Sequence, residues 1–220
     1  QVRGVLAAPT QERAEAGVKT LPCWVIGRST LVGHWAEEIG LYVEADVWSP
    51  VEYDGSPPDR RALQKDFGKY DVVIMSYESV RADFDSLDKF DWCYCVLDEG
   101  HAIRNPKSRV TQAVKSVRAE HRLLLSGTPI QNDVVELWSL FDFLMPGFLG
   151  TEREFKKTYG IAAARSAAAK KGGGLSEQGA LATGALHKQV MPFVMRRTKD
   201  EVLKDLPPKI IQDVYVELTD

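Results

Sequence analysis

Short apolar runs alternate with helix-like segments between residues 20 and 145, and this alternation limits the possible folds more than any other feature of the sequence. Runs rich in Val, Ile and Leu are typical of strands that are covered on both faces. The predicted strands cover residues 21–26, 45–48, 71–76, 93–97 and 122–125. Because strands that alternate with helices usually pair in parallel, the sequence predicts an α/β fold, a doubly wound parallel sheet flanked by helices.

Several of the intervening helices have recognisable starting residues. Ser29 or Thr30 can cap the helix after the first strand, and Ser108 caps the helix after the fourth. Asp133 and Glu136 have the spacing of a capping box, at the start of a helix that runs to residue 145. Further helices are predicted over residues 5–18, 60–67, 79–84, 152–159 and 186–203.

The strand pattern stops at Pro146, and most of the remaining residues have a helical pattern. Residues 162–184 are rich in Ala, Gly, Ser and Lys, which predicts a mobile insertion with partial helicity at its alanines. We therefore divide the chain into a sheet domain at 1–150, a helical protrusion at 151–205 that contains this insertion, and the start of a linker at 206–220.

The composition is that of an ordinary globular protein. Of the 220 residues, 44% are hydrophobic and 27% are charged, which is enough to build a sizeable core. The net charge of −3 means that any surface for nucleic acid must be a local patch. The sequence contains no apolar stretch long enough to span a membrane, and we expect no membrane partner. It begins without an initiator Met or a signal peptide, so we expect it to be a piece of a longer protein.

The three cysteines, Cys23, Cys93 and Cys95, are an odd and sparse set, which indicates a reducing intracellular compartment. Their spacing fits no usual zinc pattern. Because cysteines two apart on a strand share a face, we expect Cys93 and Cys95 to pack on one buried face as small apolar residues.

Two adjacent acids follow the fourth predicted strand, in the sequence Asp98-Glu99-Gly100-His101. They would lie at the carboxyl end of a buried strand, where open α/β sheets bind their ligands. In nucleotide hydrolases an acid at this position holds Mg²⁺, and a neighbouring acid can orient and deprotonate the attacking water. Taken alone, these four residues are equally compatible with a polar turn that closes the strand.

Four polar stretches follow predicted strands in order. They are Gly-Arg-Ser-Thr-Leu at 27–31, Ser-Tyr-Glu at 76–78, Asp-Glu-Gly-His at 98–101 and Ser-Gly-Thr-Pro-Ile-Gln-Asn at 126–132. Together they resemble motifs Ia, Ib, II and III of superfamily II helicases. The extended pattern resembles Swi/Snf-type DNA translocases through Glu-Leu-Trp-Ser-Leu at 136–140, Arg-Arg-Thr-Lys at 196–199 and Leu-Pro-Pro-Lys at 206–209. Within that family, residues 31–35, 140–153 and 205–213 resemble the branch that removes TATA-binding protein from promoter DNA.

The resemblance covers residues 20–220 and implies a RecA-like, P-loop NTPase-type lobe of an ATP-driven motor that moves along double-stranded DNA in the nucleus. It implies that Asp98 binds Mg²⁺ together with ATP, that Glu99 activates the water, and that His101 completes the catalytic set. It implies that Ser126, Gly127, Thr128 and Gln131 couple the nucleotide state to DNA. TATA-binding protein would be contacted by regions outside this chain.

The resemblance also implies contacts to DNA phosphates, which would grip the backbone without reading bases. The candidate side chains are Ser29, Thr30, Tyr77, Arg104, Asn105 and Lys107. Each of them, taken singly, could equally be a helix cap or a solvated side chain. Arg28 departs from the family pattern, which usually has a proline in this motif.

Two parts of such a motor are not found in this sequence. No Gly-x-x-x-x-Gly-Lys-Ser/Thr phosphate loop occurs in it, and we expect that loop upstream of Gln1. We expect a second lobe with an arginine finger beyond Asp220. Since hydrolysis needs these groups together, the isolated chain is predicted to be inactive. The alternative is a lobe that is retained as a non-catalytic module for binding DNA or protein.

Overall fold

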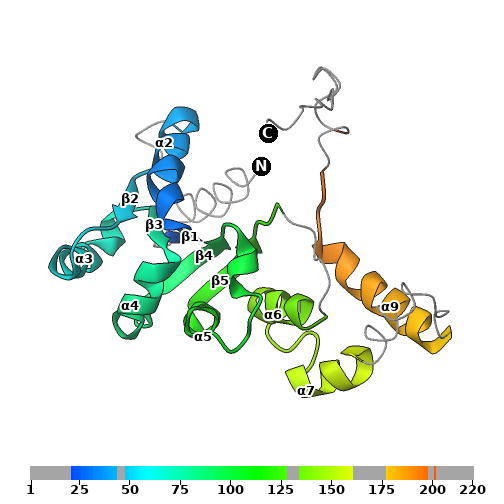
Figure 1. The fold of residues 1–220 in the computed structure, drawn as a ribbon. Coiled ribbons are helices and arrows are strands. Elements are labelled where there is room, and N and C mark those ends of the chain that lie inside the picture. The colour runs from blue at the N-terminus through cyan, green and yellow to red at the C-terminus, as the bar shows by residue number, and fades with distance from the viewer. Residues whose placement is uncertain (1–20, 44–47, 128–133, 161–176, 198–200, 202–220) are drawn as a thin grey trace, which may run out of the picture.

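A computed structural model describes residues 21–43, 48–127, 134–160, 177–197 and 201. Its described strands form one parallel sheet in the order β2-β3-β1-β4-β5 (Figure 1). The strands are β1 Cys23–Gly27, β2 Pro50–Tyr53, β3 Val72–Ser76, β4 Asp91–Leu97 and β5 Arg118–Leu124. The chain therefore builds one half of the sheet, crosses over β1, and builds the other half. The predicted α/β class and parallel sheet are confirmed.

Two strands differ from the prediction because pairing, rather than apolar content, sets their limits. The strand predicted at 45–48 is found later, at β2, where Pro50 is the partner of Val72. Trp48 is a buried core residue that precedes it, and residues 45–47 lie outside the described part. β5 begins before residue 122, because its polar first half pairs with β4 from Arg118 opposite Asp91 onward.

The helices lie between the strands and beyond the sheet. The α-helices are α2 Val32–Tyr42, α3 Pro57–Gln64, α4 Tyr77–Leu87, α5 Arg109–Ser116, α6 Val134–Leu144, α7 Glu152–Phe155 and α9 Glu177–Val190. Single turns of 3-10 helix cover Ser29–Leu31, Phe67–Lys69, Gly100–Ile103 and Met191–Phe193, and a π-helical turn covers Lys156–Gly160. The helix predicted at 5–18 lies outside the described residues.

The caps were predicted with mixed success. Ser108 caps α5 as predicted, because its Oγ accepts from the backbone N–H of Thr111 at 3.1 Å. Ser29 and Thr30 cap no helix, since a 3-10 turn covers them and α2 starts only after Leu31. α4 begins before its predicted start, because the Oγ of Ser76 caps it. α3 likewise begins earlier, at residue 57, and Asp133, the other predicted cap, lies outside the described residues.

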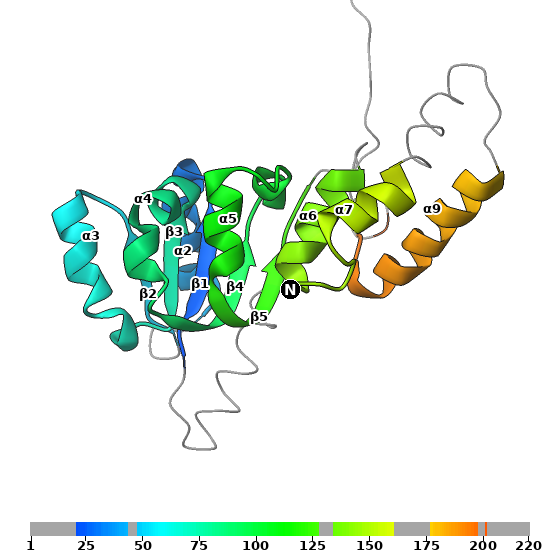
Figure 2. The same cartoon turned by 90° about the horizontal axis from the view of Figure 1, so that it is seen from below.

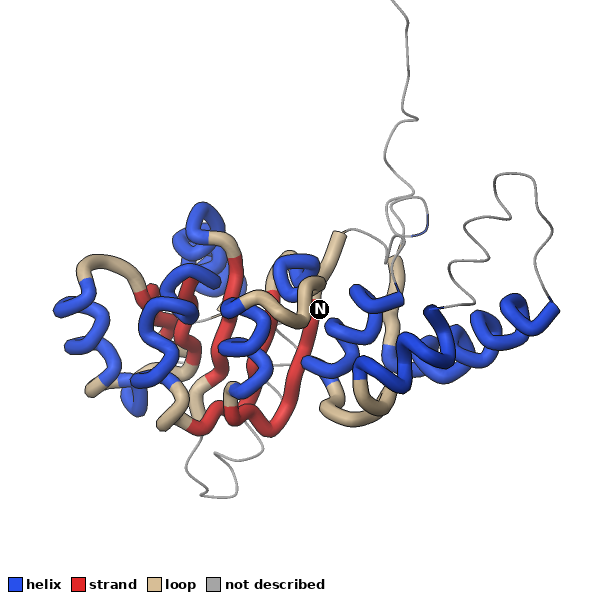
Figure 3. The backbone as a smooth tube through the Cα atoms, turned by 60° about the horizontal axis from the view of Figure 1, so that its bottom comes forward, coloured by secondary structure: helices blue, strands red, loops and turns tan. Residues whose placement is uncertain are grey.

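Helices cover both faces of the sheet (Figures 2 and 3). On one face Val80 of α4 and Val114 of α5 pack on a cluster that includes Trp24, which stacks on Trp92 at 4.7 Å between ring centroids. On the other face Ile39 of α2 packs on a second cluster. The sheet is thus a buried layer, which explains its nearly continuous apolar strands.

The three cysteines pack as small apolar residues, but on different sides. Cys93 lies with Cys23 in the cluster under α2, whereas Cys95 lies in the cluster under α4 and α5. The prediction that Cys93 and Cys95 share a face is wrong. Residues three apart on a regular strand face opposite sides, but Trp92 and Cys95 belong to the same cluster, so the alternation of sides is broken between them. Burial raises the pKa of the Cys23 and Cys95 thiols to about 12.

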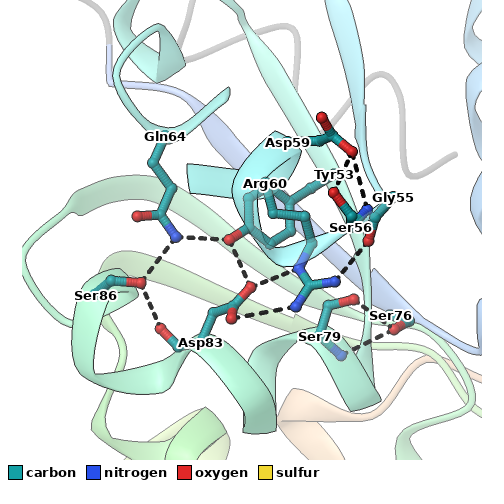
Figure 4. A network of polar contacts seen from close by, with 10 residues as sticks. All are labelled: Tyr53, Gly55, Ser56, Asp59, Arg60, Gln64, Ser76, Ser79, Asp83 and Ser86. Atoms are coloured by element: carbon teal, nitrogen blue, oxygen red, sulfur yellow. Dashed lines mark hydrogen bonds and ion pairs between the residues drawn. The ribbon is translucent and has the colours of Figure 1, made fainter. Parts of the chain in front are cut away.

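A polar network joins β2, α3 and α4 near one edge of the sheet (Figure 4). The carboxylate of Asp83 accepts from Arg60 Nε at 2.6 Å and from the hydroxyl of Tyr53 at 2.8 Å. Gln64 donates to that hydroxyl at 2.6 Å and to Ser86 at 2.8 Å. The charges of Arg60 and Asp83 pair with each other, and these bonds join α3 to α4.

The last helices form a third cluster beyond β5 (Figures 1 and 2). Its buried members are Leu137, Trp138, Phe141, Phe155, Leu186 and Val190. α9 begins at Glu177, inside the predicted insertion, and ends before the predicted residue 203. A 3-10 turn containing Pro192 follows it, because proline offers no N–H to continue a helix. Residues 161–176 lie outside the described part.

Among the described residues, no helix is both long and apolar enough to cross a membrane.

Candidate active site

The carboxyl ends of the three central strands bring the predicted motifs to one edge of the sheet. Gly27 of β1 is level with Ser76 of β3, and Ile26 is level with Leu97 of β4. The residues that follow these strands therefore start side by side, although they are far apart in the sequence. The strand order reverses direction beside β1, and ligands of open α/β sheets usually bind at the carboxyl ends of the strands at such a switch point.

Asp98 is held at this edge through its backbone and its side chain. Its backbone N–H donates to Ile26 O at 2.8 Å, and its carbonyl accepts from the Tyr77 hydroxyl at 2.9 Å. Of its two carboxylate oxygens, Oδ1 accepts from the N–H of Glu99 at 2.9 Å and Oδ2 accepts from Trp35 Nε1 at 2.8 Å. The carboxylate is thus oriented by neutral donors from two directions.

Glu99 turns the chain sharply. Its φ of 51° makes it the single non-glycine residue with positive φ among the described residues. Such a conformation costs on the order of 1 kcal/mol and often occurs at functional sites. The next residue must be glycine, because a Cβ on Gly100 would lie 2.3 Å from Cγ of Leu124. The turn leaves the Glu99 side chain 37% exposed.

His101 lies between Glu99 and Arg28. Nη2 of Arg28 is 3.0 Å from Nε2 of His101, and Oε2 of Glu99 is 3.2 Å from Nδ1, at an angle outside that of a hydrogen bond. A guanidinium can only donate, so Nε2 must be the accepting nitrogen. In the neutral ring the proton is then on Nδ1, where it faces the carboxylate of Glu99. A chain of polar contacts therefore runs from the end of β1 to Glu99.

The predicted coupling residues are only partly described. Ser126 and Gly127 follow β5 and are exposed, and the residue before them, Leu125, donates its N–H to Leu97 O at 2.8 Å. That bond places Ser126 and Gly127 at the same sheet edge as Asp98. Thr128 and Gln131 lie outside the described residues.

The predicted DNA-binding residues fall into two groups. Ser29, Thr30 and Tyr77 line a hollow of about 520 Å³ at the strand ends, which we call the strand-end hollow. Its lining is completed by Arg28, Glu78, His101, Ala102, Ser108 and Val110. The hydroxyl of Tyr77 is committed to the carbonyl of Asp98, and burial raises the pKa of Tyr77.

The second group, Arg104, Asn105 and Lys107, is exposed on the following turn and does not line the strand-end hollow. Nε of Arg104 lies 3.9 Å from the carboxylate of Glu136, and Oδ1 of Asn105 accepts from the N–H of Lys107 at 3.0 Å. Asn105 therefore shapes the turn, while Arg104 and Lys107 present positive charge.

Two residues of this edge were missed from the sequence as site residues. Trp35 was not predicted as a site residue, but its indole N–H donates to Oδ2 of Asp98, 63 residues away. Arg28 was noted only as a departure from the family pattern, yet it contacts His101. No sequence signal ties Trp35 to Asp98, whereas the position of Arg28 beside a motif could have suggested a role.

The residues at this edge fit Mg²⁺ bound together with a nucleotide. No lysine or arginine among the described residues forms an ion pair with Asp98 or Glu99, and the basic side chain beside Glu99 is that of His101. The described residues contain no group of three or more potential metal ligands. A hard cation held by one or two carboxylates would complete its octahedron with waters and phosphate oxygens, which is how Mg²⁺ is bound in nucleotide hydrolases.

Comparisons with known proteins agree with this arrangement. Residues 5–220 match the model of the SNF2-related domain. The chain is 52% identical to "TATA-binding protein-associated factor BTAF1" of Arabidopsis thaliana over 221 residues, which is all of this chain and 11% of that protein. It is 50% identical to "TATA-binding protein-associated factor MOT1" of Saccharomyces cerevisiae, over 92% of this chain and 11% of that protein. The chain thus spans about a tenth of the length of these relatives.

A solved structure shares the fold. The SWI2/SNF2 ATPase core of Sulfolobus solfataricus, in complex with double-stranded DNA, superimposes with a TM-score of 0.71 at 30% sequence identity. The match covers 89% of this chain and 38% of that one, and the RecA-like lobe architecture is confirmed. The chain belongs to the SNF2-related domain family.

Proposed function

We propose that this chain is part of the first lobe of an ATP-dependent translocase on double-stranded DNA. The observation that carries the proposal is the pair Asp98 and Glu99 at the carboxyl edge of a parallel sheet, where neutral N–H groups orient Asp98 and no lysine or arginine of the described residues pairs with either acid. The lobe would occupy residues 1–150, the helical protrusion residues 151–205, and the beginning of a linker residues 206–220.

In this proposal each residue has a distinct task. Asp98 would hold Mg²⁺ with ATP, and Mg²⁺ when bound neutralises charge on the β- and γ-phosphates. Glu99, half-exposed beside this position, would align the attacking water and accept its proton. His101 would lie beside Glu99 with its Nδ1 3.2 Å from that carboxylate, and Ser126, Gly127, Thr128 and Gln131 would couple the nucleotide state to DNA binding.

DNA would lie along the strand-end hollow and the turn beside it. Ser29 and Thr30 offer hydroxyls and backbone amides there, and Arg104 and Lys107 offer positive charge. Such contacts bind phosphates and not bases, so binding would fall steeply with salt and depend little on sequence. The contact of Arg28 with His101 would connect this surface, through His101, to Glu99.

The names of the relatives suggest which DNA-bound protein the motor acts on. Two proteins about half identical to this chain are named as TATA-binding protein-associated factors. We propose that the parent protein acts in the nucleus and uses ATP to remove TATA-binding protein from DNA. Contacts to TATA-binding protein would come from regions outside this chain.

Triplex displacement tests the motor activity. The full-length protein is mixed with a duplex that carries a third strand, and release of that strand is followed with ATP or with ADP. We expect ATP-dependent release by the wild type and none by Glu99→Gln. Glu37→Gln is the matched control, because Glu37 is an exposed residue of α2. It should release the strand at the wild-type rate.

Two results would count against the proposal. If wild-type protein hydrolyses ATP without releasing the third strand, the lobe is not part of a translocase. If neither ATP hydrolysis nor strand release is found, the non-catalytic binding module is the better description.

A further inference from the structure

The indole of Trp35 lies where it can control the carboxylate of Asp98. Nε1 of Trp35 is 2.8 Å from Oδ2 of Asp98, within the range of a charge-assisted hydrogen bond to an ionised carboxylate. The two residues come from different elements, the first turns of α2 and the end of β4. The bond therefore joins α2, which covers one face of the sheet, to the residue that follows β4.

Trp35 is itself held in place by packing. Its ring is partly buried against the cluster under α2, which contains Val32, Ile39 and Trp48. A ring fixed in this way presents its N–H in one direction. Oδ1 of Asp98 is fixed separately by the N–H of Glu99, so that both oxygens of the carboxylate are oriented. Each oxygen has a further lone-pair direction that remains for a ligand.

We infer that Trp35 is a positioning residue that orients the Asp98 carboxylate for a divalent cation. The inference rests on the proposed function, in which Asp98 holds Mg²⁺ with the nucleotide. Partners that orient a ligating side chain usually change metal affinity by about 10- to 100-fold when they are lost. The contact does not merely satisfy a buried indole, because Nε1 of the fully buried Trp24 has no hydrogen-bond partner among the described residues.

The inference predicts a specific defect when the donor is removed. Trp35→Phe keeps an aromatic ring in the cluster but deletes the N–H. In the full-length protein, we expect the affinity for Mn²⁺ in the presence of ADP, measured by electron paramagnetic resonance, to fall about 10-fold. ADP affinity measured in EDTA should be unchanged, because the defect acts through the metal.

Trp48→Phe is the matched control. Trp48 belongs to the same cluster and is 5% exposed, so the substitution removes the same group from the same packing environment. The indole that donates a hydrogen bond to Asp98 is that of Trp35, not that of Trp48. We expect its Mn²⁺ affinity to stay within about 2-fold of wild type, since no ligand loses its orientation.

A double-mutant cycle guards against a general packing effect. If Trp35 acts through Asp98, Trp35→Phe should add little to the loss already caused by Asp98→Asn. The inference is overturned if Trp35→Phe binds Mn²⁺ as wild type does, if Trp48→Phe loses as much, or if the two losses simply multiply. Failure of the wild type to bind Mn²⁺ with ADP would instead overturn the proposed function, and the inference with it.

Discussion

Acidic residues at two places in this chain differ in whether a positively charged side chain pairs with them. In the network of Figure 4, Arg60 and Tyr53 both donate to the carboxylate of Asp83, and the Arg60 and Asp83 side chains are only 13% and 16% exposed. At the strand edge, Asp98 and Glu99 have no arginine or lysine partner among the described residues. Asp98 is instead oriented by neutral N–H groups.

Under the proposed function, this difference separates a structural acid, Asp83, from a ligand-binding one, Asp98. A half-buried carboxylate that is paired with a guanidinium contributes to stability and has little capacity left for a ligand. A carboxylate that is oriented but lacks a counter-charge retains that capacity, at some cost in stability. Substitutions at the two groups of acids and at their neighbours should therefore have different consequences.

The largest effect is expected for Asp98→Asn. In the full-length protein we expect DNA-stimulated ATP hydrolysis to fall at least about 100-fold, because asparagine lacks the charge that a cation needs. Asparagine has a single acceptor oxygen and can keep only one of the two bonds from Trp35 and Glu99, so the free energy of unfolding of the chain in urea should fall by less than about 1 kcal/mol. A large loss of stability would place Asp98 in the same class as Asp83.

Asp83→Asn should have the reverse outcome. It removes a paired charge and leaves Arg60 without its partner, so we expect the free energy of unfolding to fall by about 2 kcal/mol. Urea unfolding measures this change. Asp66→Asn is the control, because the Asp66–Lys69 pair is highly exposed and its loss should leave the free energy of unfolding nearly unchanged. Equal effects in the two variants would contradict the distinction between paired and exposed acids.

The Asp83 network should also respond to acid. Burial tends to raise the pKa of Asp83, but hydrogen bonds from Arg60 and Tyr53 outweigh it and hold that pKa below the ordinary value. A lowered folded-state pKa adds stability above the ordinary aspartate pKa of about 4, and this stability is lost as the pH falls through the folded-state pKa. The difference in unfolding free energy between wild type and Asp83→Asn should therefore be constant near neutral pH and shrink below about pH 4. A difference that grows in acid would contradict this sign.

Arg28→Gln should have the smallest effect. The substitution removes the charged donor to His101, and we expect the DNA-stimulated ATPase rate of the full-length protein to fall about 5-fold, the equivalent of one hydrogen bond. Arg109→Gln removes a similar charge beside the strand-end hollow, and no hydrogen bond or ion pair joins Arg109 to His101 in the described part of the chain. Equal losses in both variants would mean that only charge matters here.

The sequence predicted the elements whose signals are local. Buried strands such as β3 and the Ser108 cap follow from apolar runs and short spacings, and they placed Asp98 at a strand end. The sequence-based predictions were wrong where contacts with residues distant in the sequence determine the structure. β2 is defined by pairing with β3, and Cys93 and Cys95 were assigned to one face although they lie in two clusters.

The candidate site divides in the same way. Asp98 and Glu99 could be predicted because two acids after an apolar strand form a contiguous signal. The bond from Trp35 could not be predicted, because a tryptophan that faces a core and one that reaches a carboxylate have the same helical spacing. The positive φ of Glu99 also has no sequence signature, since glutamate rarely adopts it.

The proposed role of Glu99 is tested by measuring ATP binding and ATP hydrolysis separately in the Glu99→Gln variant of the full-length protein. We expect ATP affinity to stay near the wild-type value and hydrolysis on double-stranded DNA to fall by about 100-fold or more, because the substitution removes the carboxylate that we propose to activate water. Hydrolysis at the wild-type rate by Glu99→Gln would contradict the assignment of this strand edge as half of an ATPase site.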